Sequence, residues 1–187
     1  MSRIQPINYE SATPTVKQLL DGVQRKLGVT PKMVTTMAQS PAVLEAYVSF
    51  SGALAKGELN ARLREQIALV SAEVNACGYC ASAHNAIAKT IGLSSEQIWA
   101  ARNAHASDSK SDATLRFARD LILKRGEITD SDFRKLRDAG LSDAEIAEVI
   151  AHVALNIFTN YFNLTAKTEI DFPEVEIGAA ALATPVI

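Results

Sequence analysis

The sequence has little of the features that mark membrane, exported or nucleic-acid-binding proteins. No apolar run approaches the roughly 18 residues that a membrane span needs. The net charge of −2 gives no basic surface for nucleic acid or anionic lipid. The opening stretch, MSRIQPINYESATPTVKQ, has no apolar signal core. We therefore expect a cytoplasmic protein with no nucleic-acid or membrane partner.

Cysteine is scarce as well, with two residues in the chain, Cys77 and Cys80. Two cysteines cannot form the disulfide framework of a small secreted domain. In a reducing compartment, a close thiol pair is more often catalytic or metal-binding than structural. The two thiols are therefore the first candidates for chemistry.

Alternation of period two is also missing, so nothing in the sequence argues for a sheet. Helix punctuation recurs instead, because polar N-cap residues precede stretches with apolar residues at helical spacing. Helices are predicted from about Asp112 to Arg125 and, the longest, from Ser142 to about Lys167. The other N-cap candidates are Thr30, Ser40, Asn60, Ser94 and Thr129. The pattern predicts an all-α protein.

The chain of 187 residues fits one domain. We expect a helical extension over about residues 1–39, a core over about 40–172, and an extended tail over 173–187 that has no helical period. The motif GLSSEQI at 92–98 recurs as GLSDAEI at 140–146. In both copies a glycine ends one helix and a serine caps the next. This favours a duplicated helical hairpin within one bundle, although Gly-Leu-Ser is also a common helix connector.

Two thiols and an imidazole lie close together in the stretch NACGYCASAHNAIAKTIG, residues 75–92. A structural zinc site needs four ligands, and the sequence has one CxxC and no second pair. On an unbroken helix, His84 lies about 10 Å along the axis from Cys77, which is awkward for one ion. We therefore expect no metal and no cofactor. An open three-ligand zinc site remains the alternative.

The same spacing suits thiol redox chemistry. Cysteines at i and i+3 of a helical turn are close enough for a disulfide. His84 follows Cys80 by one turn, on the same helix face, where it can take the thiol proton and stabilise the thiolate. A helix start near Gly78 would favour Cys77 as the attacking thiol through the helix dipole, whereas His84 favours Cys80. The residues alone leave the two roles open.

A line of polar residues follows one face of the long C-terminal helix pattern. Because buried polar groups need partners, this face is expected at a subunit interface, in a polar network or in a reaction pocket. The candidates on it for a pocket or an interface are His152, Asn156 and Asn160.

The stretch EQIALVSAEVNACGYCASAH, residues 65–84, resembles the signature of the AhpD-like alkylhydroperoxidase and carboxymuconolactone decarboxylase family. In that signature a glutamate is followed by eleven residues, then CxxC, three residues and a histidine. The positions that match are Glu65, Cys77, Cys80 and His84, and the resemblance covers about residues 40–172. It implies an all-α, AhpD-like bundle with an internal helical duplication, assembled as a homo-oligomer. It also implies that Cys80 attacks a hydroperoxide and that Cys77 resolves it to a disulfide.

The carboxylate could be either of two residues. On an unbroken helix Glu73 would share a face with the thiols, whereas a break near Ala76 would favour Glu65 beside His84. Gly78 and Asn75 favour the break, so Glu65 is the candidate. Tyr79 is a departure, because the best-known peroxidase of the family has histidine there. A tyrosine does not relay protons near neutral pH as histidine does, so the change bears on peroxidase efficiency, and Tyr79 is grouped with the pocket or interface candidates.

We thus expect a peroxidase that reduces hydroperoxides through a Cys77–Cys80 disulfide cycle. Its partners would be a small-molecule hydroperoxide, a dithiol or redox-protein reductant, and further copies of itself. One alternative is a non-thiol decarboxylase or lactone-handling enzyme. The other is a zinc-binding or redox-sensing module without turnover.

Overall fold

The computed structural model describes residues 1–178, and within these residues all regular structure is helical. Nine α-helices make up this part of the chain. They are α1 (Pro14–Leu27), α2 (Lys32–Met37), α3 (Pro41–Leu54), α4 (Ala61–Val74), α5 (Gly78–Thr90), α6 (Ser95–Arg102), α7 (Ser109–Leu123), α8 (Asp130–Asp138) and α9 (Asp143–Ala166). The prediction of an all-α protein is confirmed.

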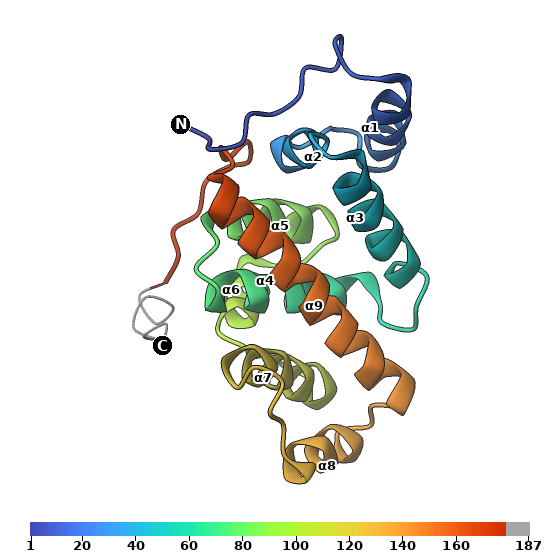
Figure 1. The fold of residues 1–187 in the computed structure, drawn as a ribbon. Helices are drawn as coiled ribbons and strands as arrows, with labels where there is room; N and C mark the ends of the chain where they lie inside the picture. Colours follow the sequence, from blue (N-terminus) through green and yellow to red (C-terminus); the bar gives the residue numbers. More distant parts are fainter. Residues whose placement is uncertain (179–187) are drawn as a thin grey trace.

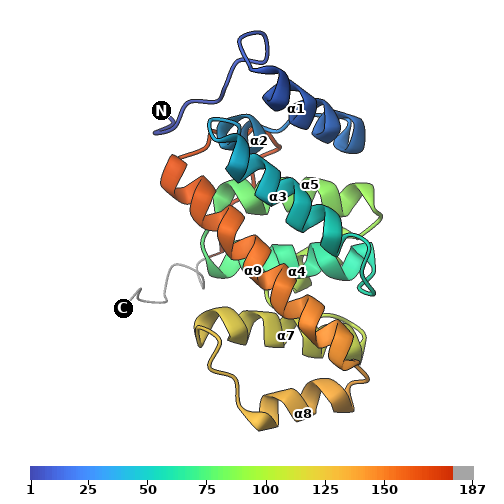
Figure 2. The ribbon, with the colours of Figure 1, turned by 45° about the vertical axis from the view of Figure 1, so that its right-hand side comes forward.

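Helix α4 lies at the centre of the bundle, with α5, α6, α7 and α9 packed around it. Figures 1 and 2 show α1 and α2 at one end of the molecule and α7 and α8 at the other. The long helix α9 runs diagonally between these ends and passes over α4. Because α9 spans both ends, its side chains contribute to both parts of the core described next.

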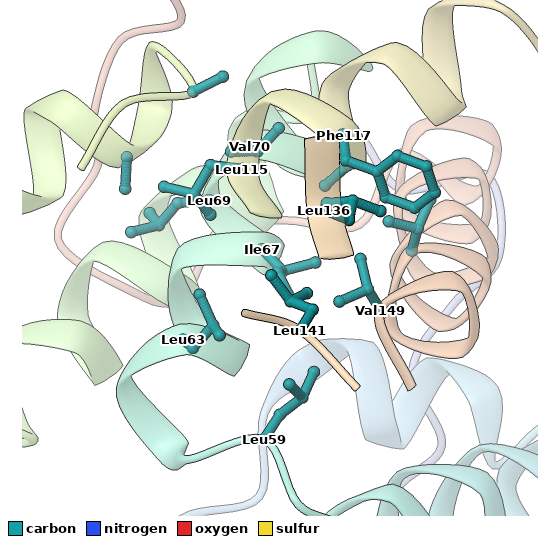
Figure 3. Close-up of a cluster of buried hydrophobic side chains, with 14 of the residues drawn as sticks. Leu59, Leu63, Ile67, Leu69, Val70, Leu115, Phe117, Leu136, Leu141 and Val149 are labelled. Atoms are coloured by element: carbon teal, nitrogen blue, oxygen red, sulfur yellow. The ribbon is translucent and has the colours of Figure 1, made fainter. Parts of the chain in front are cut away.

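The apolar core has two parts. The first lies between α4, α7, α8 and α9 and contains Ile67, Leu115, Leu136 and Val149, all at most 2% exposed (Figure 3). The second joins the N-terminal helices to the start of α5, and both thiols belong to it. The stretch that holds the two thiols is therefore packed into a core and does not lie on a surface loop.

Most helix ends follow the expected punctuation. The side chains of Asn60, Ser94 and Ser142 each accept a hydrogen bond from a backbone N–H of the first turn. Two boundaries differ from the prediction. Helix α2 has Pro31, not Thr30, as its N-cap, and α7 begins at Ser109, earlier than predicted, because Asp108 caps it. Aspartate is as good an N-cap as serine, so the earlier cap is used.

The repeated Gly-Leu-Ser motif has the same backbone structure in both copies. Gly92 and Gly140 have φ of 84° and 88°, in the left-handed region that ends a helix. The N–H of the leucine that follows bonds back to a carbonyl of the helix it leaves, Ala88 in one copy and Leu136 in the other. The serine then opens a capping box in each copy. The two connections α5–α6 and α8–α9 are thus equivalent turns.

The ends of the described chain are tied to the bundle. The N–H of Arg3 donates to the carbonyl of Ala166 at 2.7 Å, and the N–H of Val175 donates to Ser82 Oγ at 3.1 Å. Residues 173–178 of the expected tail have no helix or strand, and residues 179–187 lie outside the described residues. Within residues 1–178, no helix combines the length and the apolar character needed to cross a membrane. The division into extension, core and tail stays a prediction.

The two faces of α7 allow a test of the first core. Leu115 is fully buried, whereas Leu123 on the same helix is 47% exposed. Leu115→Ala is expected to lower the free energy of unfolding by about 2–5 kcal/mol, because it leaves a cavity between packed helices. Leu123→Ala should change it by no more than about 0.5 kcal/mol. Urea unfolding followed by circular dichroism measures both, and equal effects would contradict this packing.

Candidate active site

The site is built around a sharp break between α4 and α5. Helix α4 ends at Val74, and Ala76 then takes a left-handed conformation with φ of 52°. The N–H of Cys77 bonds back to the carbonyl of Ala72 at 2.9 Å, which closes the turn. Cys77 is the N-cap of α5, so the CxxC motif occupies the first turn of a new helix. The break expected near Ala76 is present.

Both cysteines are free thiols and buried, with 1% exposure for Cys77 and 3% for Cys80. Their Sγ atoms lie 2.7 Å apart, so a disulfide can form with little movement of the backbone. The N–H of Cys80 donates to the sulfur of Cys77 at 3.4 Å. The sulfur of Cys77 thus acts as the N-cap acceptor for a free N–H at the helix start.

The surroundings shift the pKa values of the two thiols in opposite directions. The pKa of Cys80 is lowered from 9.0 to about 7, first by the hydrogen bond from Cys77, then by the charge of His84 and by the amides of Asn163 and Asn160, against the opposing effect of burial. The pKa of Cys77 is raised, first by its hydrogen bond to Cys80 and then by burial. Cys80 is therefore the thiol that ionises near neutral pH.

His84 pairs with Glu65 across the break. Nδ1 of His84 lies 2.7 Å from Oε2 of Glu65, and each side chain is about one-fifth exposed. Burial lowers the pKa of His84, but the charge and hydrogen bond of Glu65, together with the charge of Cys80, raise it above 6.5 in sum. Glu73 instead accepts a hydrogen bond from Arg102 at 2.8 Å. The structure thus places Glu65, and not Glu73, beside the imidazole.

A pocket of about 570 Å³ opens onto this group. Cys80, His84 and Glu65 line it, whereas Cys77 does not. The remaining walls are mainly apolar and come from α1, α2, α3, α5, α9 and the segments that flank α2 and α9. They include Val23, Leu27, Val29, Met33, Val34, Val48, Ile87, Leu155 and Phe172. A molecule in the pocket therefore meets the sulfur of Cys80 first, with Cys77 behind it.

The model of the carboxymuconolactone decarboxylase family matches residues 41–123, which hold Glu65, both thiols and His84. This segment of the chain, together with its four signature residues, thus resembles that family. The matched segment runs from α3 to α7, so the break that positions the thiols lies within the family segment. The helices α1, α2, α8 and α9 lie outside it.

Solved structures resemble the whole fold beyond the family segment. One is the alkylhydroperoxidase AhpD core of an uncharacterized peroxidase-related protein from Ralstonia eutropha, at 25% identity, 91% of this chain, 92% of that chain and a TM-score of 0.82. A second is a Cys→Ala variant of the debrominase Bmp8 in complex with 2,3,4-tribromopyrrole, at 22% identity, 98% and 95% coverage and a TM-score of 0.78. A third is an uncharacterized peroxidase-related protein from Silicibacter, at 22% identity, 96% and 95% coverage and a TM-score of 0.76. No curated protein matches the sequence.

Tyr79 lies between the two cysteines, and its contacts are with α2 and Phe172. Its side chain is 5% exposed, and its hydroxyl accepts a hydrogen bond from the N–H of Met33 at 3.1 Å. Its ring packs edge-on against Phe172, with the centroids 5.8 Å apart. Burial is the main cause that raises the pKa of this hydroxyl. Tyr79 therefore lines one side of the pocket and anchors α2 to α5.

The polar face of α9 is buried within the chain. His152 and Asn156 line the pocket, whereas Asn160 does not. Asn160 is 0% exposed, and its oxygen accepts a hydrogen bond from Nδ2 of Asn75 at 2.9 Å. The amide of Asn156 donates to the backbone oxygen of His152 at 2.8 Å. The amide of Asn156 and the oxygen of Asn160 thus find partners inside the chain, without a second subunit.

Two residues of the site were not predicted from the sequence as site residues. Tyr47 of α3 lines the pocket, and its pKa is raised to about 12 by burial first and then by the nearby charges of Glu65 and Cys80. Asn163 of α9 donates its amide to the sulfur of Cys80 at 3.3 Å. No signal in the sequence pointed to Tyr47. Asn163, by contrast, lies on the polar face that the sequence did reveal.

The described part of the chain contains no group of side chains arranged as metal ligands. Among residues 1–178, no three His, Cys, Asp or Glu side chains are grouped so that they could hold a metal ion.

The Glu65–His84 pair leads to a prediction about the pH dependence of Cys80. Glu65→Gln removes the charge that raises the pKa of His84, so less imidazolium remains near neutral pH to stabilise the thiolate. The pKa of Cys80 should therefore rise from about 7 towards its ordinary 9.0. A rise of one unit leaves about tenfold less thiolate below the midpoint. Iodoacetamide alkylation of the reduced chain across pH, read by peptide mass spectrometry at Cys80, measures the midpoint.

Glu73→Gln is the matched control, because it removes the same charge from a residue that pairs with Arg102. Its alkylation midpoint should equal that of the wild type. If Glu65→Gln and Glu73→Gln shift the midpoint equally, His84 does not depend on Glu65.

Proposed function

We propose that the protein is a thiol peroxidase that reduces organic hydroperoxides through a Cys77–Cys80 dithiol–disulfide cycle. The observation that carries the proposal is the asymmetry of the thiols. Cys80, whose pKa is lowered to about 7, lines the pocket beside His84, and Cys77 lies behind it with the sulfurs 2.7 Å apart. The match of residues 41–123 to the carboxymuconolactone decarboxylase family model and the fold shared with a peroxidase-related protein support it.

In the first step, the Cys80 thiolate attacks the terminal oxygen of the hydroperoxide. An S–O bond forms, the O–O bond breaks, and the alkoxide leaves with a proton from the His84 imidazolium. Glu65, 2.7 Å from Nδ1, holds the ring and stabilises its charge before that transfer. The products are an alcohol and the sulfenic acid of Cys80.

In the second step, the Cys77 thiol attacks the sulfenic sulfur. An S–S bond forms and the hydroxide leaves with the thiol proton as water. The high pKa of Cys77 keeps it protonated until this point, so it does not compete for the peroxide. An external dithiol or redox protein then supplies two electrons and two protons to restore both thiols. The cycle as proposed needs neither cofactor nor metal.

The apolar walls of the pocket favour an organic hydroperoxide over hydrogen peroxide. An alkyl or aryl group would bury apolar surface against side chains such as Leu27, Val29 and Val48, at roughly 25 cal/mol per Å². Hydrogen peroxide has no apolar surface to bury.

Peroxide consumption with dithiothreitol as reductant tests the cycle. The wild type should consume cumene hydroperoxide, and Cys80→Ser should fall to the rate of the reductant alone. With dithiothreitol removed, Cys77→Ser should consume one equivalent of peroxide and stop, with a sulfenic acid on Cys80 that dimedone traps. A label on Cys77 in Cys80→Ser would reverse the roles. Turnover of a substrate by the double serine variant would instead favour the non-thiol decarboxylase or lactone-handling alternative.

We also propose that the protein is a homo-oligomer, through the outer face of α9. This face carries Ile150, Phe158, Tyr161 and Leu164, each between 37% and 58% exposed. Their spacing places them along one side of the helix, and a contiguous exposed apolar strip of this kind marks a protein contact.

Light scattering coupled to gel filtration tests the assembly. The wild type should elute as an oligomer at micromolar concentration, and Tyr161→Lys with Leu164→Lys should shift it to the monomer, because paired charges would face the partner. Trp99→Lys is the control, since this side chain is 68% exposed and lies on α6, which packs against α4. A wild type that elutes as a monomer would refute the proposal.

A further inference from the structure

The helix start that holds the CxxC motif does not stabilise Cys80 directly. At this N-terminus the backbone N–H of Cys80 donates to the sulfur of Cys77 and not to its own sulfur. The thiol of Cys77 donates to the sulfur of Cys80. A buried thiolate on Cys80 needs further hydrogen-bond donors, because an anion with few donors is costly in the interior.

Helix α9 supplies such donors. Nδ2 of Asn163 donates to the sulfur of Cys80 at 3.3 Å, and Asn163 is 3% exposed. One turn earlier on α9, Asn160 is fully buried, and its Nδ2 has no hydrogen-bond partner among the residues that the structure describes. Both amides act to lower the pKa of Cys80, after Cys77 and His84.

Asn160 is held in place by the turn that carries the thiols. Its oxygen accepts a hydrogen bond from Nδ2 of Asn75, the residue at the C-cap of α4 just before the left-handed Ala76. Because Asn75 occupies the oxygen side of the amide, the Nδ2 side faces away from Asn75. The N–H group that faces away has no other acceptor, and an unpaired buried donor is unfavourable unless an acceptor appears.

A thiolate is such an acceptor, whereas a neutral thiol accepts hydrogen bonds only weakly. We propose that Asn163 and Asn160 form an amide cradle that holds Cys80 as the thiolate, with Asn75 fixing the position of Asn160. The proposal rests on the proposed function only in taking Cys80 as the reacting thiol. Two neutral donors suit this position, because they stabilise the thiolate without placing a second positive charge beside His84. A second cation there would disfavour the imidazolium form of His84.

The pH profile of Cys80 alkylation tests the cradle without any peroxide. Asn163→Leu keeps the volume of the side chain and removes its donor, so the midpoint should rise by about one unit or more, which is about tenfold less thiolate below it. A purely structural loss would lower the melting temperature and leave the midpoint in place. Asn85→Leu is the matched control, because Asn85 is a buried asparagine on α5 that does not line the pocket.

Asn75→Ala provides a second arm if Asn163→Leu does not fold. It leaves every side chain around the sulfur intact and removes the anchor of Asn160, so a smaller rise of the midpoint is expected. A midpoint equal to that of the wild type in Asn163→Leu overturns the cradle, and an unchanged midpoint in Asn75→Ala overturns the part of Asn75 and Asn160. Failure of the peroxidase proposal would be seen in the peroxide assay. It would not affect the alkylation profiles, which are measured without peroxide.

Discussion

The site depends on one backbone constraint, the left-handed turn at Ala76 between α4 and α5. A non-glycine residue in this conformation is uncommon, and here the bond from the N–H of Cys77 to the carbonyl of Ala72 closes the turn around it. The turn ends α4 and starts α5 at Cys77, so Glu65 near the start of α4 reaches His84 on α5. A continuous helix would have separated these two side chains by several turns.

Because of this turn, the two thiols differ in their hydrogen-bond partners and in the direction of their pKa shifts. The free N–H at the helix start goes to Cys77, which thereby takes the place of an N-cap side chain and lies away from the pocket. Cys80 gains a hydrogen bond from Cys77, a nearby imidazolium and the amides of α9, and it faces the pocket. Burial acts against ionisation of both sulfurs, so the number and charge of neighbouring groups decide which one ionises.

The parts outside the family segment complete this arrangement. Helix α9 brings Asn163 to the sulfur and places His152 in the pocket wall, and Val23 and Leu27 of α1 form another wall. The family segment thus carries both thiols, His84 and Glu65, while the surrounding helices form much of the pocket wall. This fits a bundle in which α1 and α2 lie at one end of the molecule, packed against α3 (Figure 2).

The sequence by itself determined the helical class, most helix starts and the choice of Glu65, because caps, helical spacing and a break near Gly78 act within a few residues. The start of α1 at Thr13-Pro14 carried the same local signal, and α7 began earlier than predicted because Asp108 competed as a cap. Only the tertiary structure decided that Cys80 faces the pocket, that Asn163 meets its sulfur and that Tyr47 lies near it. These contacts join residues far apart in the chain, and no local periodicity encodes which face of α3 or α9 meets α5.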